Sequence, residues 1–468
     1  MSLLFSVFGH TARTPKPECG TLYGNALRAY EQKNYTLSCR ILEEFVTKDR
    51  TNAQAHNLLG ATYMQLQHAK KAAGQFAKAV ECAGDNSSCL ANLGHTLATL
   101  GEFDEASRCL RHALDIDPDN APALYNWLIG GGLSESDLRR AEQLGTTMLA
   151  KGDDNKAILA HFTLGKLYDE TNRFAEAFDH FTAGNRLKRA TLNFDIAGVQ
   201  TLAEEIKLSP VGQLVGTDNA PLASAARPIF IIGMPRSGST LLERILAQQF
   251  GLGIGGELTA ISEIAEEMSM FGNASSPASL HALTSEDRLF YANAYLRWLD
   301  QRFGTRVNIV DKYLFNFFNV GFIKQLFPDA RFIDATRDPL DTCLSCYFTL
   351  FSVSNEFSYD IDELAQYYAL YQGLMKHWKA AFPDNIATVT YRDVVDNKQR
   401  VVDFLRTALY IDDNHSFSAI PTAETPIYTA SFAQARRPIY RDSLERWRRY
   451  GTRVEPLRQA LLDAGVAL

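Results

Sequence analysis

The sequence predicts a chain of two parts, an α-helical repeat array followed by an α/β domain built on a parallel sheet. The first 200 residues repeat a glycine at intervals close to 34 residues, which is typical of stacked helical hairpins. The remainder alternates short apolar runs with amphipathic stretches, which is typical of doubly wound sheets. We therefore expect repeats over residues 20–190, a connecting segment over 191–226, and the second domain over 227–468, with a P-loop-like turn near its start.

The composition is that of a soluble globular protein. Of the 468 residues, 46% are apolar, 22% are charged and 11% are aromatic, which argues against disorder. The formal net charge of −7 gives no reason to expect nucleic acid binding, so any anion site must be a local basic patch. No run of about 18 apolar residues and no basic leader occur, and the seven cysteines are scattered. We expect a cytoplasmic chain without a membrane span.

Three glycines with the same downstream pattern indicate helix-turn-helix repeats. Small residues would let paired helices approach closely, and neighbouring units would stack to cover their apolar faces, as in the tetratricopeptide (TPR) signature. Residues 20–50 look like a degenerate first unit. The concave face of such an array binds a peptide or partner, or else the array only packs on the second domain or dimerises. The three sets, with the alanine twelve residues on and the large apolar residue sixteen on, are Gly60, Ala72 and Phe76; Gly94, Ala106 and Leu110; and Gly165, Ala177 and Phe181.

Strands of the second domain are predicted where short apolar runs occur, and helices where apolar residues recur every three to four positions. In a doubly wound sheet, ligands collect at the carboxyl ends of the strands, where the motifs described next lie. The expected strands are 229–232, 307–311, 331–336 and 386–390, and the expected helices are 240–248, 285–303, 339–351, 362–382 and 397–409.

The turn GMPRSGST joins the first of these strands to a helix, and it is the strongest candidate for an anion site. Backbone amides at the start of that helix have no helical partners and point into one concavity. Gly233 and Gly238 stand as in GxxxxGK[ST], but Ser239 replaces the lysine that reads a nucleoside triphosphate. The alternative is a glycine turn without a ligand. The side chains that can hold an anion are Arg236, Ser237, Ser239 and Thr240.

Two further motifs lie at expected strand ends. Arg337 ends a strand, and Ser345 follows two turns into the helix opened by Pro339, so both can approach one anion. Glu257 ends the glycine-rich turn GIGGEL, where a carboxylate would enter the cleft at a helix start. The alternatives are a surface ion pair for Arg337 and a helix-start glutamate for Glu257.

These motifs together resemble the sulfotransferases that use 3′-phosphoadenosine 5′-phosphosulfate (PAPS), most of all the tyrosylprotein sulfotransferase-like branch, over residues 228–450. The resemblance implies that PAPS is the co-substrate and that no metal is needed. It implies that residues 236–240, including Gly238, hold the 5′-phosphosulfate and that Arg337 and Ser345 hold the 3′-phosphate. Glu257 would be the general base that takes the proton of the acceptor hydroxyl.

The same resemblance implies roles for residues in three other segments. Lys312 in VDKYLFN and Ser431 in TASFAQARRPIY would stabilise the leaving phosphate, although the family often has proline soon after the lysine and this chain has Tyr313. Tyr391 in TYRDVVDN would lie near the adenine. Arg436, or its neighbour Arg437, would add charge, although an exposed basic helix would also explain this arginine-rich run.

The predicted function is transfer of the sulfuryl group of PAPS to an acceptor hydroxyl, with a protein tyrosine suggested by the resembling branch. The expected partners are an acceptor peptide, protein or glycan, and a protein on the concave face of the repeats. The alternatives are a sulfotransferase acting on a carbohydrate or small molecule, a divergent kinase, and a non-catalytic TPR scaffold.

Overall fold

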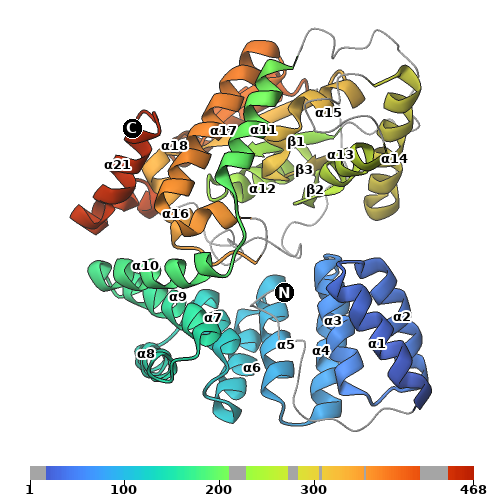
Figure 1. Ribbon diagram of the computed structural model, residues 1–468, viewed down its shortest axis with the longest axis vertical. Coiled ribbons are helices and arrows are strands. Elements are labelled where there is room, and N and C mark those ends of the chain that lie inside the picture. The colour runs from blue at the N-terminus through green and yellow to red at the C-terminus, as the bar shows by residue number, and fades with distance from the viewer. Residues whose placement is uncertain (1–16, 210–227, 272–282, 305–307, 353–354, 412–440) are drawn as a thin grey trace. The chain divides into compact units, whose positions relative to one another are not determined.

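The structure, a computed structural model, describes residues 17–209, 228–271, 283–304, 308–352, 355–411 and 441–468. The chain divides into two compact units. The first comprises the described chain up to Leu192 together with the segment Phe348–Glu356. The second contains a five-stranded sheet and the helices around it (Figure 1).

The first unit is built from helices joined by short turns. Neighbours in the chain pack as pairs, α1 with α2, α3 with α4, α5 with α6, and α9 with α10, as the repeats predict. The bounds are α1 (Pro17–Glu31), α2 (Tyr35–Lys48), α3 (Ala53–Gln65), α4 (Ala69–Ala83), α5 (Ser87–Leu100), α6 (Phe103–Ile116), α7 (Ala121–Gly130), α8 (Glu135–Ala150), α9 (Asp154–Glu170) and α10 (Phe174–Ala190).

Asparagine side chains define where several of these helices begin. Asn34, Asn52, Asn86 and Asn120 each accept a hydrogen bond from the backbone amide three residues on, at the starts of α2, α3, α5 and α7. Each such cap satisfies an amide that the helix leaves unpaired and stabilises it by about 1 kcal/mol. The starts of these four helices are therefore determined by residues next to them in the sequence.

The glycines of the repeats lie where paired helices are in contact, which confirms the sequence prediction. A Cβ atom on Gly60 would lie 2.8 Å from the Phe76 ring. The same atom on Gly94 would lie 2.6 Å from Leu110 Cγ, and on Gly165 it would lie 2.9 Å from the Phe181 ring. Each large residue thus fills the groove that its glycine leaves open.

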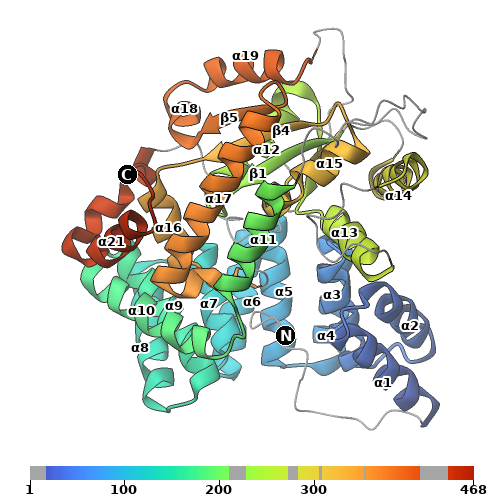
Figure 2. The ribbon, with the colours of Figure 1, turned by 45° about the horizontal axis from the view of Figure 1, so that its top comes forward.

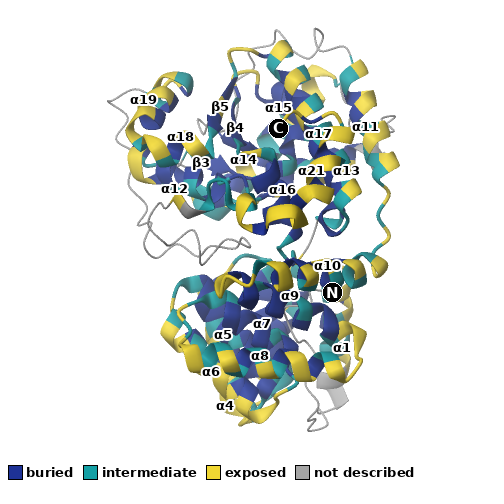
Figure 3. Cartoon of the chain, turned by 90° about the vertical axis from the view of Figure 1, so that its left-hand side faces the viewer, coloured by how far each residue is buried: buried dark blue, intermediate teal, exposed yellow. Residues whose placement is uncertain are grey.

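The second unit is organised around a fully parallel sheet of order β2-β3-β1-β4-β5. Its three central strands, β3, β1 and β4, are almost entirely buried (Figure 3) because helices cover both faces. β1 pairs with β4 in a regular register that runs from Ile229 opposite Arg331 to Gly233 opposite Ala335. The strands are β1 (Ile229–Gly233), β2 (Gly253–Gly256), β3 (Ile309–Asp311), β4 (Arg331–Thr336) and β5 (Ile386–Thr390).

No described helix combines the length and apolar character that a membrane crossing requires. The helices and shorter 3₁₀ turns (η) of this unit follow the predicted alternation. They are α11 (Ile196–Leu208), α12 (Ser239–Phe250), α13 (Ala260–Phe271), α14 (Ser285–Phe303), η3 (Leu314–Phe318), α15 (Val320–Leu326), α16 (Pro339–Tyr347), η4 (Glu356–Tyr359), α17 (Ile361–Ala381), α18 (Tyr391–Asp396), α19 (Lys398–Ala408), η6 (Arg441–Ser443), η7 (Arg446–Val454) and α21 (Glu455–Asp463).

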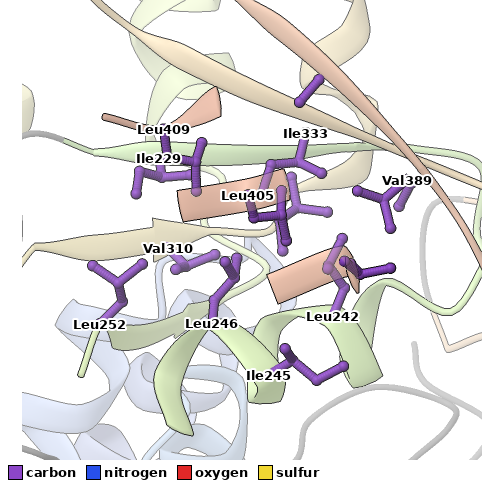
Figure 4. Close-up of a cluster of buried hydrophobic side chains, with 14 of the residues drawn as sticks. Ile229, Leu242, Ile245, Leu246, Leu252, Val310, Ile333, Val389, Leu405 and Leu409 are labelled. Carbon is purple, nitrogen blue, oxygen red and sulfur yellow. The ribbon is translucent and has the colours of Figure 1, made fainter. Parts of the chain in front are cut away.

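Alternate residues of the strands face opposite layers of helices. On one face, Ile229, Ile231 and Ile333 pack with Leu242 and Leu246 of α12 and with residues of α19 (Figure 4). On the other face, the ring of Phe230 stacks with those of Phe332 and of Tyr295 from α14. This two-residue alternation fixes the strand register because a slip by one residue would exchange the two faces.

The structure differs from the predicted elements at three places. The expected connecting segment contains α11, which runs beside α17 (Figure 2) and bonds to it from Gln200 to Gln366 at 3.0 Å. The glycine-rich stretch before Glu257 forms β2, which was expected to be only a turn. The helix expected over 339–351 ends at Tyr347.

A Gly60→Ala substitution should destabilise the protein by about 1–3 kcal/mol, because the added methyl group would overlap the buried Phe76 ring. Gly74→Ala in α4 is a matched control, since a Cβ atom there meets nothing within 4 Å. It should instead stabilise the helix by roughly 0.5–1 kcal/mol. Thermal unfolding of the two variants measures the difference, and equal midpoints would show that the close helix contact is not tight.

Candidate functional site

The candidate site lies at the edge of the sheet where all five strands end. Because every strand is parallel, the five carboxyl ends meet at one edge. A residue or loop predicted from the sequence follows each end directly. In the order of the strands across the sheet, these are Glu257 after β2, Lys312 after β3, the turn 234–238 after β1, Arg337 after β4, and Tyr391 after β5.

The turn after β1 is held by contacts that only glycine permits. Gly233 has φ 143°, and a Cβ atom there would lie 2.5 Å from the carbonyl oxygen of Ala335 on β4. Gly238 has φ 96°, and a Cβ atom there would lie 2.5 Å from Cδ2 of Tyr391. Both positions therefore require glycine for space and for backbone conformation. The second contact also brings the predicted adenine-side residue Tyr391 against the turn.

The turn leads into α12 in a way that suits an anion. Gly238 is the N-cap of α12 and offers no side-chain acceptor to the first amides of the helix. The hydroxyl of Ser237 is buried, and no described residue forms a hydrogen bond with it. Ser239 and Thr240 are also buried, in the first turn of the helix. Unpaired amides and a positive helix end favour negative charge at this position.

The two arginines predicted to bind opposite ends of the donor lie in one cluster. Arg236 Nε donates to Ser345 Oγ at 3.0 Å, and Arg337 Nη1 donates to the carbonyl oxygen of Arg236 at 3.4 Å. Arg337 Nε is buried and has no hydrogen-bond partner within the described part of the chain. Burial raises the pKa of the Cys346 thiol to about 12, although both guanidinium groups are close enough to oppose this. Ser345, which was predicted to share one anion with Arg337, thus forms a hydrogen bond with Arg236 of the turn in this structure.

A C-terminal segment completes this side of the site. Tyr391 Oη and Ser443 Oγ are 2.8 Å apart, and Arg337 Nη2 donates to the carbonyl oxygen of Ser443. The buried carboxylate of Asp341 lies 3.6 Å from Arg337 Nη2 and accepts backbone N–H bonds from Glu445 at 2.7 Å and Trp447 at 3.2 Å. The segment is therefore anchored to the same arginine as the turn.

Sequence reasoning singled out other residues of this C-terminal region. Ser431, Arg436 and Arg437 lie outside the described residues. Ser443 was missed because nothing in RDSLERWRRY distinguishes a serine that contacts the site from an exposed one. The arginine-rich run was also open to interpretation as an exposed basic helix, whereas its described part forms 3₁₀ turns interrupted at Glu445, which has φ 54°.

Lys312 lies between two carboxylates at the other end of the site. Its side chain is 1% exposed, and Nζ is 3.4 Å from Glu257 Oε1 and 3.8 Å from Glu243 Oε2. The Glu257 side chain is 47% exposed, so it contacts the buried ammonium and is also accessible to solvent. Glu243 was missed by sequence reasoning because it stands on a helix whose pattern, TLLERILAQ, explains the apolar residues and leaves the charged ones to solvent.

Asp311, at the end of β3, is a buried carboxylate next to this group. Its carboxylate accepts hydrogen bonds from Tyr295 Oη at 2.8 Å and from the backbone amide of Tyr313 at 3.0 Å. Burial raises the pKa of Asp311 from 3.8 to about 7, although both hydrogen bonds oppose the shift. These bonds fix the strand end from which Lys312 projects.

Comparison with known families identifies parts of the chain. Residues 228–414 match the model of the sulfotransferase family, and residues 87–120 match that of the tetratricopeptide repeat. The chain therefore contains a sulfotransferase family domain and a TPR repeat. Among the residues that the structure describes, no three histidine, cysteine, aspartate or glutamate side chains come together as metal ligands would.

Relatives and solved structures cover different parts of the chain. An uncharacterized protein of Aquifex aeolicus is 26% identical over 387 residues, which is 80% of this chain and 50% of that protein. The CTR9 homolog of Arabidopsis thaliana is 29% identical over 126 residues, 26% of this chain and 11% of that protein. The chain thus spans at most half the length of these two relatives. A structure of MamA from Desulfovibrio magneticus, at 16% identity and TM-score 0.32, covers 38% of this chain and 100% of that one.

An Asp311→Asn variant should gain stability over wild type as the pH rises from about 4 to about 7. In this range the folded chain keeps a proton on Asp311 that the unfolded chain has released, because the folded-state pKa is raised from 3.8 to about 7. Wild-type stability therefore falls with rising pH, by at most about 1.4 kcal/mol per pH unit, whereas asparagine does not ionise.

Urea unfolding of both proteins at several pH values measures this effect. Below about pH 4 the stability difference should be constant, since Asp311 is then protonated in both states. A difference that stays constant up to pH 7 would show that Asp311 is ionised in the folded protein throughout.

Proposed function

We propose that this chain transfers the sulfuryl group of PAPS to an acceptor hydroxyl. The observation that carries the proposal is the order of groups along the sheet edge, which runs Glu257, Lys312, the turn 234–238, Arg337 and Tyr391. This is the order in which an acceptor proton, a leaving phosphate oxygen, a 5′-phosphosulfate, a 3′-phosphate and an adenine ring would lie. The sulfotransferase family match over residues 228–414 supports the same reaction.

The donor side of the site suits a nucleotide with two separate anionic ends. The turn would hold the 5′-phosphosulfate with its helix-start amides, the hydroxyl of Ser237 and the guanidinium of Arg236. Arg337 would hold the 3′-phosphate, and its buried Nε donor has no partner among the residues that the structure describes. Ser345 would hold this phosphate with it and, through the 3.0 Å bond to Arg236, also position the turn. Such buried donors without partners are costly unless a ligand satisfies them.

The acceptor side supplies the groups that sulfuryl transfer requires. The acceptor oxygen bonds to sulfur as the bond from sulfur to the 5′-phosphate oxygen breaks, and the hydroxyl proton must leave. Glu257, half exposed at the end of β2, would take that proton. Lys312, whose ammonium is held in a dry environment, would stabilise the charge that develops on the leaving oxygen. Ser431 and Arg436 are proposed to assist there, on the resemblance alone.

We further propose a peptide acceptor with a tyrosine hydroxyl. The support is the helical repeat unit, since TPR arrays commonly bind peptides and would raise the local concentration of such an acceptor. The same site chemistry also serves sugars and small phenols. Mass spectrometry of sulfated products from a lysate supplied with labelled PAPS identifies the acceptor, and label found only on glycans or small molecules would exclude a tyrosine.

Arg337→Ala should weaken binding of 3′,5′-diphosphoadenosine by roughly 10- to 150-fold, the value of a charged hydrogen bond to a phosphate. Isothermal titration calorimetry measures the affinity. Arg458→Ala is the matched control, because Arg458 is a half-exposed arginine of α21 that pairs only loosely, at 3.6 Å, with Glu455. Unchanged affinity in Arg337→Ala, or no binding by the wild type, would contradict the proposed donor site.

Glu257→Gln should keep the affinity for 3′,5′-diphosphoadenosine and lose roughly 100- to 10,000-fold in turnover, because glutamine cannot accept the proton. Turnover is followed as transfer of radiolabelled sulfate from PAPS to lysate acceptors. Glu263→Gln, which alters an exposed glutamate of α13, serves as the control. If Glu257→Gln transfers sulfate at the wild-type rate, another group is the base.

A further inference from the structure

Glu243 is a buried carboxylate that none of the roles above uses. It lies on α12, the helix that starts at the anion-binding turn, and only 3% of the residue is exposed. Its Oε1 accepts a hydrogen bond from the backbone amide of Gly256 at 2.9 Å. Its Oε2 lies 3.8 Å from Lys312 Nζ. One side chain thus contacts the residue that precedes Glu257 and the ammonium that Glu257 approaches.

The burial of this group needs a compensating interaction. Burial raises the pKa of Glu243, while the Lys312 ammonium and the Gly256 amide act in the opposite direction. An isolated buried carboxylate would be strongly unfavourable, and so would the ammonium of Lys312, which is 1% exposed. Each charge therefore stabilises the other within the protein interior.

If Lys312 assists sulfuryl transfer, its ammonium must move from its contact with Glu257 to the leaving oxygen. Its ammonium lies 3.4 Å from Glu257 Oε1, so while this contact lasts it occupies the oxygen that would take the acceptor proton. The base must therefore be released when the acceptor hydroxyl binds and Lys312 turns to the leaving oxygen. A buried ammonium that leaves Glu257 still needs a counter-charge, and Glu243 already lies next to it.

We infer that Glu243 is a positioning residue that anchors Lys312 as its permanent counter-ion and fixes the turn that carries Glu257. The catalytic part of this inference rests on the proposed function, whereas the ion pair between Glu243 and Lys312 does not depend on it. Through α12, the same residue ties the phosphosulfate end of the site to the acceptor end. Asp311 does not compete for this role, because its oxygens already accept bonds from Tyr295 and from the Tyr313 amide.

The test compares Glu243→Gln, Lys312→Met and the double variant in the full-length chain. Glutamine keeps the size of the side chain and an acceptor for the Gly256 amide, so the substitution removes mainly the charge. We expect Glu243→Gln to bind 3′,5′-diphosphoadenosine with wild-type affinity in calorimetry. Its rate of radiolabelled sulfate transfer to lysate acceptors at saturating PAPS should fall by roughly 10- to 100-fold, because Lys312 then stays on Glu257.

Two comparisons distinguish positioning from a general structural role. Adding Glu243→Gln to Lys312→Met should cause no further loss of rate, since residues that act as one unit are not additive. The melting temperature should fall in each single variant and recover in the double variant, in which neither charge is left unpaired. This second readout needs no activity and no acceptor, so it holds even if a single variant is too unstable to assay.

Glu204→Gln, an exposed glutamate of α11 paired with Lys207, is the matched control and should match the wild type throughout. Wild-type turnover in Glu243→Gln, or additive losses of rate and melting temperature in the double variant, would overturn the inference. A wild-type protein that neither binds 3′,5′-diphosphoadenosine nor transfers sulfate would instead refute the proposed function. The melting temperatures would then still decide whether Glu243 and Lys312 form the pair.

Discussion

The whole site depends on the sheet being parallel throughout. Parallel pairing places Gly233 opposite Ala335, so that the turn after β1 and Arg337 after β4 leave the sheet at the same edge. Lys312 leaves on the other side of the turn because β3 is the other neighbour of β1. Reversing any one of these strands would carry its polar residue to the opposite edge. The backbone pairing therefore dictates which charges meet before any side-chain contact is made.

Within this frame, close packing of the turn sets the conformation of Arg236. This residue has φ 68°, a left-handed conformation that costs a non-glycine residue about 1–2 kcal/mol. The hydrogen bond from its side chain to Ser345 and the bond that its carbonyl oxygen accepts from Arg337 both oppose relaxation. The arginine of the turn is thus held in place by the helix and strand end that follow it by about a hundred residues in the chain.

The chain as a whole is acidic, with a net charge of −7, yet the donor end of the site gathers Arg236, Arg337 and the first amides of α12. The acceptor end pairs one ammonium with two carboxylates. The two ends therefore differ in charge, which suits a nucleotide with two anionic groups at one end and proton removal at the other.

Much of this arrangement could be predicted from the sequence because it is local. The limits of α14 match the periodic stretch 285–303, and the glycine and phenylalanine positions of the repeats follow from helix-pair contact. The residues at strand ends could be found because apolar runs mark where strands stop. Glu243 and Ser443 could not, since each reaches the site through contacts with segments distant in the chain. β2 was missed because three of its four residues are glycine, a poor strand former.

The order of the strands also has a consequence for how the protein reaches its active form. The groups at the sheet edge come from five segments between residues 234 and 391, and each adjacent pair is joined by a long crossover. Such non-local pairings form slowly, because the chain loses entropy on closing each long loop before the stabilising contacts between strands form. The residues at this edge therefore come together only after the last strand along the chain, β5, has joined the sheet.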